Sequence, residues 1–443
     1  MSDQPRSTTS DQEESVAAPA PAPPPPRPAT YRDVFSSREY RGLFMASGLS
    51  WFGDYAARAA ITALVYAKTG SVPASAAAFA LSYLPWLLGG PVLAALADRY
   101  PYRKVMIICD LARMGLVAVV AVPDMPVPVM FALLMATAML NPPFEAARSA
   151  LLPKMVAPDR YVLSVGALGS LGQAAQIAGY VGGAALSLAS PHLTLAFNAV
   201  TFGISALLLA VFVVPRPAAL ASEQRRTILR ETGEGISIVF SRPVTRAVAT
   251  IVFTALTFVA VPEGLAAGWA AALNRGELAQ GLIMAAAPAG LIAGGLLIPR
   301  LVPPAARQKL IRPLVIIAPV VLVPALLEPP LPVVLVMVFV VGFAFGAFTP
   351  ILNGMFVQVL PSSHRARAFG VMNTGTQLSQ GLGLLAAAGL TQYFRVPFVI
   401  GGWCAAGAVA MVVASAVWPS AEVIDAEIAQ TQAANDAAAK LAG

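Results

Sequence analysis

The sequence is poor in charge. Asp, Glu, Lys and Arg make up 12% of its 443 residues, whereas hydrophobic residues make up 57%. A soluble globular domain carries about 25% charged residues, so this chain has too few charges to cover a soluble globule of its size. The shortage excludes a soluble enzyme, a disordered protein and a nucleic-acid-binding module, and it indicates a polytopic membrane protein.

Cysteine and histidine are scarce as well. The chain has two cysteines, Cys109 and Cys404, which lie far apart in apolar runs, and two histidines, His192 and His364. A CxxC pair or a Cys/His ligand cluster is missing, so we expect neither a disulfide framework nor a metal site. A Walker lysine loop and clustered catalytic groups are also missing, and we therefore expect no cofactor and no enzymatic activity.

Long apolar runs are what the sequence has in abundance. A helix that crosses a bilayer needs about 20 mostly apolar residues. Runs of this kind begin near Leu43, Ala76, Val105, Pro128, Val162, Leu193, Ala247, Leu278, Pro313, Pro332, Phe369 and Val396. The sequence therefore predicts an all-α membrane protein with twelve transmembrane helices, which has the lipid bilayer as its surroundings.

The basic residues predict the orientation of these helices. Lys and Arg gather in every second loop, and the intervening loops hold Lys68, Arg275 and Arg395. Short loops rich in Lys and Arg stay in the cytoplasm, so we expect a multi-pass protein with both termini on that side. The net charge of +7 then reflects topology and not a nucleic-acid partner. Richness in Ala and Pro, with Arg preferred over Lys, is typical of a GC-rich bacterial genome and favours the bacterial cytoplasmic membrane.

The longest break between apolar runs divides them six and six. We predict a disordered, Pro-rich cytoplasmic tail over 1–38, a six-helix bundle over 39–214, a cytoplasmic loop with an interfacial helix over 215–243, a second six-helix bundle over 244–418 and a cytoplasmic tail over 419–443, weakly helical or disordered.

The two predicted bundles echo each other. Leu152-Pro153 recurs as Leu360-Pro361, and Gln173 with Gln176 recurs as Gln377 with Gln380. The offset is about 200 residues in each case, and duplication of this kind is typical of transporters. We therefore expect two pseudo-symmetric bundles.

A few charges fall inside predicted spans, where each costs about 2.5–3.5 kcal/mol unless it has a partner or a wet cavity. Asp54 and Arg58 lie on one face of the first span. They form either a proton or substrate site that faces a cavity, or a permanent ion pair that locks the helix. Glu263 follows Pro262 late in the seventh span, and it either takes part in coupling or cation recognition or lies exposed at the outer mouth.

Other polar groups inside the spans suggest gating and cavity roles. Asp110 with Arg113, and Glu145 with Arg148, are pairs three residues apart near inner helix ends, which favours structural or gating use. Residues that could line a cavity are Trp51, Tyr55, Gln176, Gln377 and Gln380. For the last two, we expect hydrogen bonds to a neighbouring helix rather than a place on the cavity wall.

One loop carries a family resemblance. Residues 94–104 read Ala94-x-x-x-Asp98-Arg99-x-x-x-Arg103-Lys104. This pattern resembles the loop motif G-x-x-x-D-R-x-G-R-R-K of the major facilitator superfamily, with departures at Ala94 and Pro101-Tyr102. The segments Gly53-Asp54, Thr69-Gly70-Ser71, Asp110-Leu-Ala-Arg113 and Val261-Pro262-Glu263-Gly264 are similar to the twelve-helix, macrolide-efflux-like branch of drug exporters.

The resemblance covers about residues 40–418 and implies the major-facilitator fold. It also implies a gating charge network in which the loop residues Asp98, Arg99, Arg103 and Lys104 join Asp110, Arg113, Glu145 and Arg148. One departure concerns the fifth helix, where drug/proton antiporters usually carry G-P-x-x-G-G. Here Tyr180 takes the proline position, although the neighbouring glycines still permit close helix packing.

These observations together predict a secondary active transporter that works by alternating access. We expect a monomeric, proton-coupled exporter of a lipophilic or cationic small molecule, a drug or natural product, with Asp54, Arg58 and Glu263 as the coupling or substrate site. The alternative is a carrier of the same fold that performs uptake, uniport or lipid flipping without proton antiport, and Tyr180 favours it. No nucleic acid, metal or cofactor is expected to take part.

Overall fold

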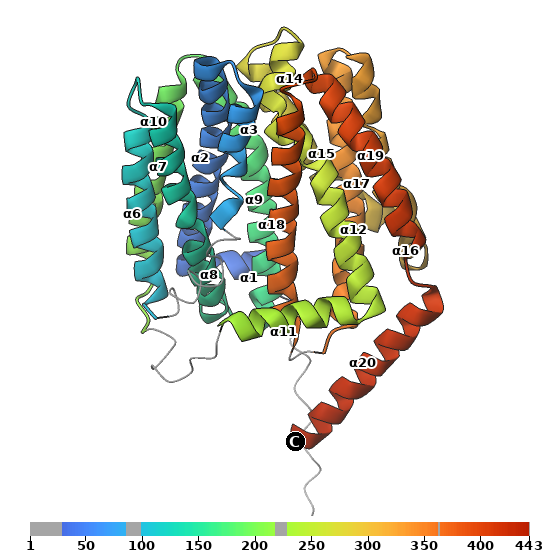
Figure 1. The fold of residues 1–443 in the computed structure, drawn as a ribbon. Helices are drawn as coiled ribbons and strands as arrows, with labels where there is room; N and C mark the ends of the chain where they lie inside the picture. The colour runs from blue at the N-terminus through green and yellow to red at the C-terminus, as the bar shows by residue number, and fades with distance from the viewer. Residues whose placement is uncertain (1–28, 86–98, 218–227, 362–363, 443) are drawn as a thin grey trace, which may run out of the picture.

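The computed structural model describes residues 29–85, 99–217, 228–361 and 364–442 (Figure 1). These residues are predominantly helical and include no strand. Helices lie at all twelve predicted spans: α2 (Arg38–Thr69), α3 (Val72–Ala80), α6 (Tyr102–Val120), α7 (Val127–Met139) with α8 (Asn141–Leu151), α9 (Pro158–Ser187), α10 (Pro191–Phe212), α12 (Pro243–Val259) with α13 (Val261–Gly264) and α14 (Ala266–Ala272), α15 (Glu277–Leu301), α16 (Pro304–Val320), α17 (Leu331–Gln358), α18 (Arg365–Leu390) and α19 (Val396–Ala416).

Seven helical stretches in the described part of the chain are long and apolar enough to cross a membrane. They are Val127–Lys154, Pro191–Phe212, Pro243–Gly264, Glu277–Leu301, Ala306–Leu327, Leu331–Gln358 and Val396–Ala416. The helices α2, α6, α9 and α18 are not among them, because charged and polar side chains such as Asp54, Arg58 and Gln377 lower their hydropathy. These four helices are therefore more polar than the seven apolar stretches.

Local sequence explains where several helices begin and end. The side chain of Ser37 accepts a hydrogen bond from the Tyr40 N–H and caps α2, which ends at Gly70 with a φ of 64°. α7 ends at Met139 because Pro142 and Pro143, in the first turn of α8, cannot donate to preceding carbonyls. The fourth span is therefore two helices in succession.

The helices form two groups that lie side by side (Figure 1). We call α2–α10 the first half and α12–α19 the second half. The helix α11 (Ile228–Ser241) lies across one end of both, where an ion pair of 3.0 Å joins Glu234 to Arg367 of α18. We call this the α11 end and the opposite end, which carries α14, the α14 end. The helix α11 falls within the loop 215–243, where the sequence predicts an interfacial helix.

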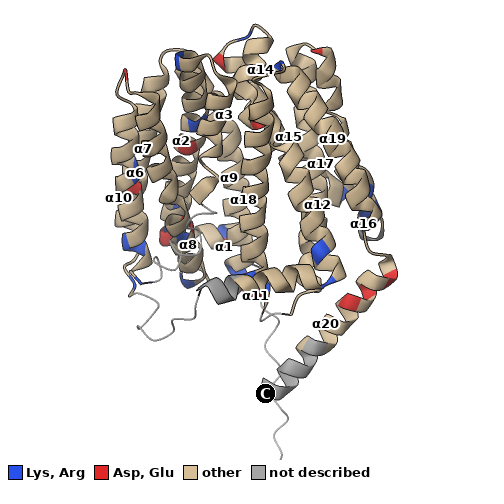
Figure 2. Cartoon of the chain, viewed as in Figure 1, with Lys and Arg blue, Asp and Glu red and all other residues tan. Residues whose placement is uncertain are grey.

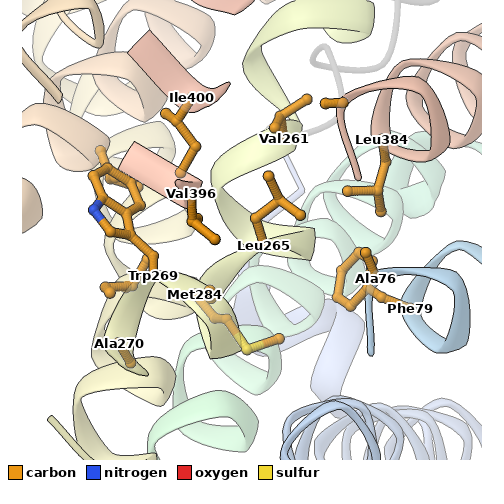
Figure 3. Packing of buried hydrophobic residues seen from close by; sticks show 14 of the residues in the cluster. Ala76, Phe79, Val261, Leu265, Trp269, Ala270, Met284, Leu384, Val396 and Ile400 are labelled. Carbon is orange, nitrogen blue, oxygen red and sulfur yellow. The ribbon is translucent and has the colours of Figure 1, made fainter. Parts of the chain in front are cut away.

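Buried apolar side chains show where the halves meet. In the described part of the chain, three apolar clusters stay within one half and its adjoining helices. A fourth joins Phe79 of α3 and Tyr180 of α9 to Leu265, Trp269 and Met284 of the second half. Figure 3 shows this cluster, in which Ala76 and Phe79 lie beside Leu265 and Leu384. The two halves are thus sealed together toward the α14 end.

The outer surface is apolar, as a lipid environment requires. Large side chains such as Val162, Leu207 and Leu301 are exposed on the outside of the described helices. Exposed apolar surface on this scale marks contact with a membrane. Lys and Arg are concentrated toward the α11 end (Figure 2).

Two predictions about the chain ends need correction. The predicted disordered segment 1–38 contains α1 (Tyr31–Phe35), because Thr30 and Asp33 cap it and Val34 is fully buried; residues 1–28 lie outside the described part. The tail after residue 419, predicted to be weakly helical or disordered, forms one helix, α20 (Ala421–Ala442). Its buried Thr431 donates a hydrogen bond of 3.1 Å to the Val359 carbonyl and so attaches α20 to the second half.

Candidate functional site

A cavity of about 600 Å³ lies between the two halves. Its wall comes from α2, α6, α8 and α9 of the first half, with Ser82 and Tyr83 after α3, and from α13 and α18 of the second. Leu152 and Tyr161, at the junction of α8 and α9, place one side of the cavity toward the α11 end. The four more polar helices α2, α6, α9 and α18 thus all contribute to the wall, together with α8 and α13.

Six ionisable Asp, Glu and Arg side chains line this cavity and balance in charge. The acids are Asp54, Glu145 and Glu263, and the bases are Arg58, Arg113 and Arg148. Groups of this kind are expensive inside a membrane, and they are found there when they face a watery cavity or one another. The cavity is therefore the candidate binding site of this chain.

Asp54 and Arg58 face the cavity without forming the ion pair that their spacing permits. The Asp54 side chain has neither an ion pair nor a hydrogen bond within the described residues. The Arg58 guanidinium lies over the ring of Tyr55, 5.1 Å from its centre. Of the two interpretations offered by the sequence, a permanent lock within the helix does not occur in this conformation.

The close packing of α2 against α10 fixes the position of α2 near Gly53. A Cβ added at Gly53 would overlap the side chains of Asn198 and Thr201, so only glycine permits this approach. The next residue, Asp54, lies on the cavity wall. Gly53-Asp54 thus combines a packing position with a cavity-facing carboxylate.

Glu263 lies in the interior and not at an outer mouth. The Tyr180 hydroxyl and the Gln176 side-chain amide, both on α9, donate hydrogen bonds to its Oε1 atom, the second at 3.3 Å. The helix breaks at Ala260 and Leu265, on either side of α13, and α14 continues the span beyond them. Glu263 thus lies late in the seventh span, as predicted, but it is not exposed at an outer mouth. The broken helix instead presents Glu263 to the opposite half.

A second polar connection between the halves was not anticipated. Gln280 of α15 is 3% exposed, and its amide donates to the Ala59 carbonyl at 3.0 Å and to the Thr62 hydroxyl at 2.7 Å. Next to it, a Cβ on Gly281 would lie 2.7 Å from the Tyr180 carbonyl oxygen. These contacts bring α15 close to α2 and α9 toward the α14 end. An isolated glutamine in an otherwise apolar span is the sequence signal that could have indicated it.

Asp110 and Arg113 connect the cavity to the interior of the first half. Asp110 is fully buried, accepts a hydrogen bond of 2.7 Å from Ser205 of α10 and pairs with Arg113 at 3.5 Å. Arg113 also donates to the Leu140 carbonyl at 2.8 Å, at the break between α7 and α8. The pair therefore ties three spans together while Arg113 still lines the cavity.

Glu145 and Arg148 form the second pair, as their spacing predicts. The Arg148 guanidinium also lies over the Trp51 ring, 4.4 Å from its centre. This pair sits on α8, on the cavity wall near Leu152. The cation–π contact connects α8 to α2 at Trp51, which also lies on the cavity wall.

The loop residues of the predicted gating network are placed differently. Asp98 lies outside the described residues, and Arg99 and Lys104 are exposed. Arg103 donates a hydrogen bond to the Ala210 carbonyl of α10. Within the described residues, the structure thus brings the two helical pairs to the interior but keeps Arg99, Arg103 and Lys104 apart from them.

The predicted cavity-lining residues Trp51, Tyr55, Gln176, Gln377 and Gln380 all line the cavity. For Gln377 and Gln380 the expected bond to a neighbouring helix is wrong. Gln380 donates to the Gln377 side chain and to the Thr376 carbonyl, both at 3.3 Å and both within α18.

Two helical halves that enclose a charged cavity inside an apolar exterior define a membrane transporter. The sequence profile of the Major Facilitator Superfamily matches residues 43–327 and 310–439, and the chain belongs to this superfamily. It is therefore a multi-pass secondary transporter with the major-facilitator fold, and not an enzyme.

Solved transporters have the same fold. A mutant of the nucleoside transporter NupG matches with a TM-score of 0.70 at 14% identity, covering 86% of this chain and 100% of its own. A POT family transporter in complex with 5-aminolevulinic acid gives 0.68 at 12% identity, covering 86% and 96%. A bacterial homologue of the human lysosomal transporter Spinster, inward-facing and occupied, gives 0.64 at 12% identity, covering 86% and 95%. No curated protein matches the sequence.

Proposed function

We propose that this chain is a proton-coupled exporter of a lipophilic or cationic small molecule, of the drug-exporter branch, in the bacterial cytoplasmic membrane. The observation that carries the proposal is the pair of carboxylates in one cavity. Asp54 is unpaired within the described residues, and Glu263 is held by donors from the opposite half. An exporter of cations needs an acidic binding group and a protonatable group that responds to movement of the halves.

The predicted orientation gives this conformation a direction. With both termini in the cytoplasm, the α11 end faces inward and the sealed α14 end faces outward. The cavity, which reaches Leu152 and Tyr161, is then loaded from the cytoplasm. Inward loading is the first step that export requires.

The cavity wall is suited to a cation with an apolar body. Asp54 offers a carboxylate to the charge, and the rings of Trp51 and Tyr161 offer apolar surface to the remainder, with Arg148 lying over the Trp51 ring. A substrate bound there separates Asp54 from water, so its charge is attracted more strongly than in solution.

Opening of the α14 end must separate Glu263 from Tyr180 and Gln176. The carboxylate then loses two donors and faces the outer side, where it can accept a proton. Protonation of Asp54 from the same side removes the attraction for the cation and releases it. The two bundles then return, and the protons leave toward the cytoplasm.

The proposal is tested with Asp54→Asn in an efflux-deficient host, using a panel of lipophilic cations. We expect unchanged expression and thermal stability but loss of pH-gradient-driven efflux, because the amide keeps the shape and removes the charge. Asp425→Asn, on the exposed face of α20, is the matched control and should export normally. Full efflux by the Asp54 variant contradicts the proposed role.

A carrier without proton antiport is the second candidate, and Tyr180 in the proline position favours it. Transport in inverted vesicles, with and without an imposed proton gradient, distinguishes the two. An exporter driven by protons accumulates substrate only with the gradient, whereas a uniporter equilibrates it in both cases.

A further inference from the structure

A second, smaller cavity of about 70 Å³ adjoins the first half's side of the main cavity. Its wall is mostly apolar and comes from five spans, with Ala57, Ala78, Phe79, Val117, Leu134 and Ala138 among its residues. Asp54, Arg58, Ser82 and Asn141 line both cavities and therefore form the boundary between them. We call this smaller cavity the side pocket.

The size of the side pocket limits what it can hold. One water-sized group needs about 10–15 Å³ of such volume, so the side pocket has room for on the order of five methyl-sized groups. That is enough for short or branched alkyl groups and too little for the body of a drug-sized molecule. It therefore has room for a substituent of a molecule in the main cavity and not for the molecule itself.

The boundary determines the chemistry of the atom that carries this substituent. Asp54 is the acid shared by both cavities, and its side chain is unpaired within the described residues. The guanidinium of Arg58 lies over the ring of Tyr55, a residue that lines the main cavity and not the side pocket. A positive centre at the boundary is paired by Asp54, while alkyl groups on that centre extend into the apolar pocket.

We propose that the side pocket is the subsite for the alkyl groups of a substituted ammonium whose nitrogen pairs with Asp54. The substrate class is an amphiphilic amine with compact N-alkyl groups and a larger aromatic or apolar body among Trp51, Tyr55 and Tyr161. This inference rests on the proposed function only in taking the main cavity as the substrate site. It requires neither export nor proton coupling.

The test uses benzyltrialkylammonium ions in which the three alkyl groups are methyl, ethyl or propyl. Their binding to the purified full-length chain is measured in nanodiscs without a gradient, so a failure of proton-driven export leaves this test intact. Each CH₂ group that enters the pocket should raise affinity about fourfold until the pocket is full, after which affinity should fall. Flat affinity across the series in the wild type overturns the proposal.

Two variants on α7 change the pocket in opposite directions. Ala138→Leu fills it and should abolish the gain from methyl to ethyl, whereas Leu134→Ala enlarges it and should move the optimum to longer alkyl groups. Ala136→Leu, at an exposed position of the same helix, should bind like the wild type. If affinity depends on alkyl length in the same way in the wild type and in all three variants, the assignment is contradicted. If Ala138→Leu misfolds, the result for Leu134→Ala decides.

The charge is tested separately. The neutral isostere, in which carbon replaces the ammonium nitrogen, should bind at least tenfold more weakly than the cation, and Asp54→Asn should remove most of that difference. Equal binding of the neutral isostere to the wild type overturns the cationic assignment. Stronger binding of an anionic analogue also overturns it, since Arg58 would then be the recognising group.

Discussion

The Tyr180 hydroxyl of α9 donates a hydrogen bond to the Glu263 carboxylate of α13, across the interface between the two halves. Tyr180 is fully buried, and its ring also packs edge-on against Tyr55, with 5.2 Å between ring centres. It occupies the position where drug/proton antiporters of the superfamily usually have proline. At this position the chain has, instead of a residue that kinks the backbone, a side chain whose hydrogen bond to Glu263 requires the two halves to be in contact.

Removing the Tyr180 hydroxyl should make it easier for the two halves to separate at the α14 end. A hydrogen bond to a charged group contributes about 1.5–3 kcal/mol, so Tyr180→Phe should raise the open population roughly 10- to 100-fold. The measurement is thiol labelling of Ala76→Cys, which is buried in the sealing cluster, in a background without Cys109 and Cys404. Tyr161→Phe, on the cavity wall but without a bond to Glu263, is the control. Equal labelling rates in both variants would show that the hydroxyl does not hold the halves together.

Neutralising Glu263 should separate coupling from binding. Glu263→Gln keeps the size of the side chain but cannot carry a proton on and off, so gradient-driven accumulation should be lost while substrate exchange across vesicles continues. Counterflow and uphill transport are measured in the same proteoliposomes. Glu422→Gln on α20 is the control. Uphill transport at the wild-type rate would assign proton coupling elsewhere.

The buried Gln280 amide should stabilise the closed α14 end. Gln280→Leu removes the bonds to Ala59 and Thr62 but keeps an apolar group of similar size, and each neutral hydrogen bond contributes about 0.5–1.5 kcal/mol. We expect a lower Tm in nanodiscs and faster labelling of Ala76→Cys by roughly 5- to 100-fold. Gln380→Leu, whose amide bonds only within α18, should label like the parent. If Gln280→Leu has the same labelling rate and the same Tm as the parent, Gln280 does not stabilise the closed α14 end.

The close approach of α9 and α15 depends on glycine. An added Cβ at Gly281 would lie 2.7 Å from the Tyr180 carbonyl and would overlap Ala184, so Gly281→Ala should push the two helices apart. Opening should become easier and Tm should fall. The control is Gly402→Ala on α19, where an added Cβ would meet no atom within 4 Å. This variant should leave opening unchanged and should keep Tm the same or raise it slightly. A Gly281 variant as stable as wild type would show that the helices can adjust freely.

Some of the candidate site could be predicted because burial of charge in a membrane is costly wherever it occurs. Asp54, Arg58 and Glu263 stand out in apolar runs, and the cavity indeed contains them. The spacing of Asp54 and Arg58 allowed an ion pair but did not require one, since Arg58 lies over Tyr55 instead. In the sequence, Tyr180 stands out only because it occupies a position where proline is usual. Its hydrogen bond to Glu263 joins residues 83 positions apart, so it depends on how the two halves pack.

The sequence by itself predicted a helix at each of the twelve apolar runs and the polar residues inside them that cannot face lipid. These follow from local hydrophobicity and from the price of an unpaired charge in a bilayer. Only the tertiary structure decided which polar groups meet. Gln280 reaches Thr62 over 218 positions, and Asp110 reaches Ser205 over 95, because helix packing sets these neighbours and helix periodicity does not. The tertiary structure alone likewise decided the side pocket, because residues from five separate spans enclose it.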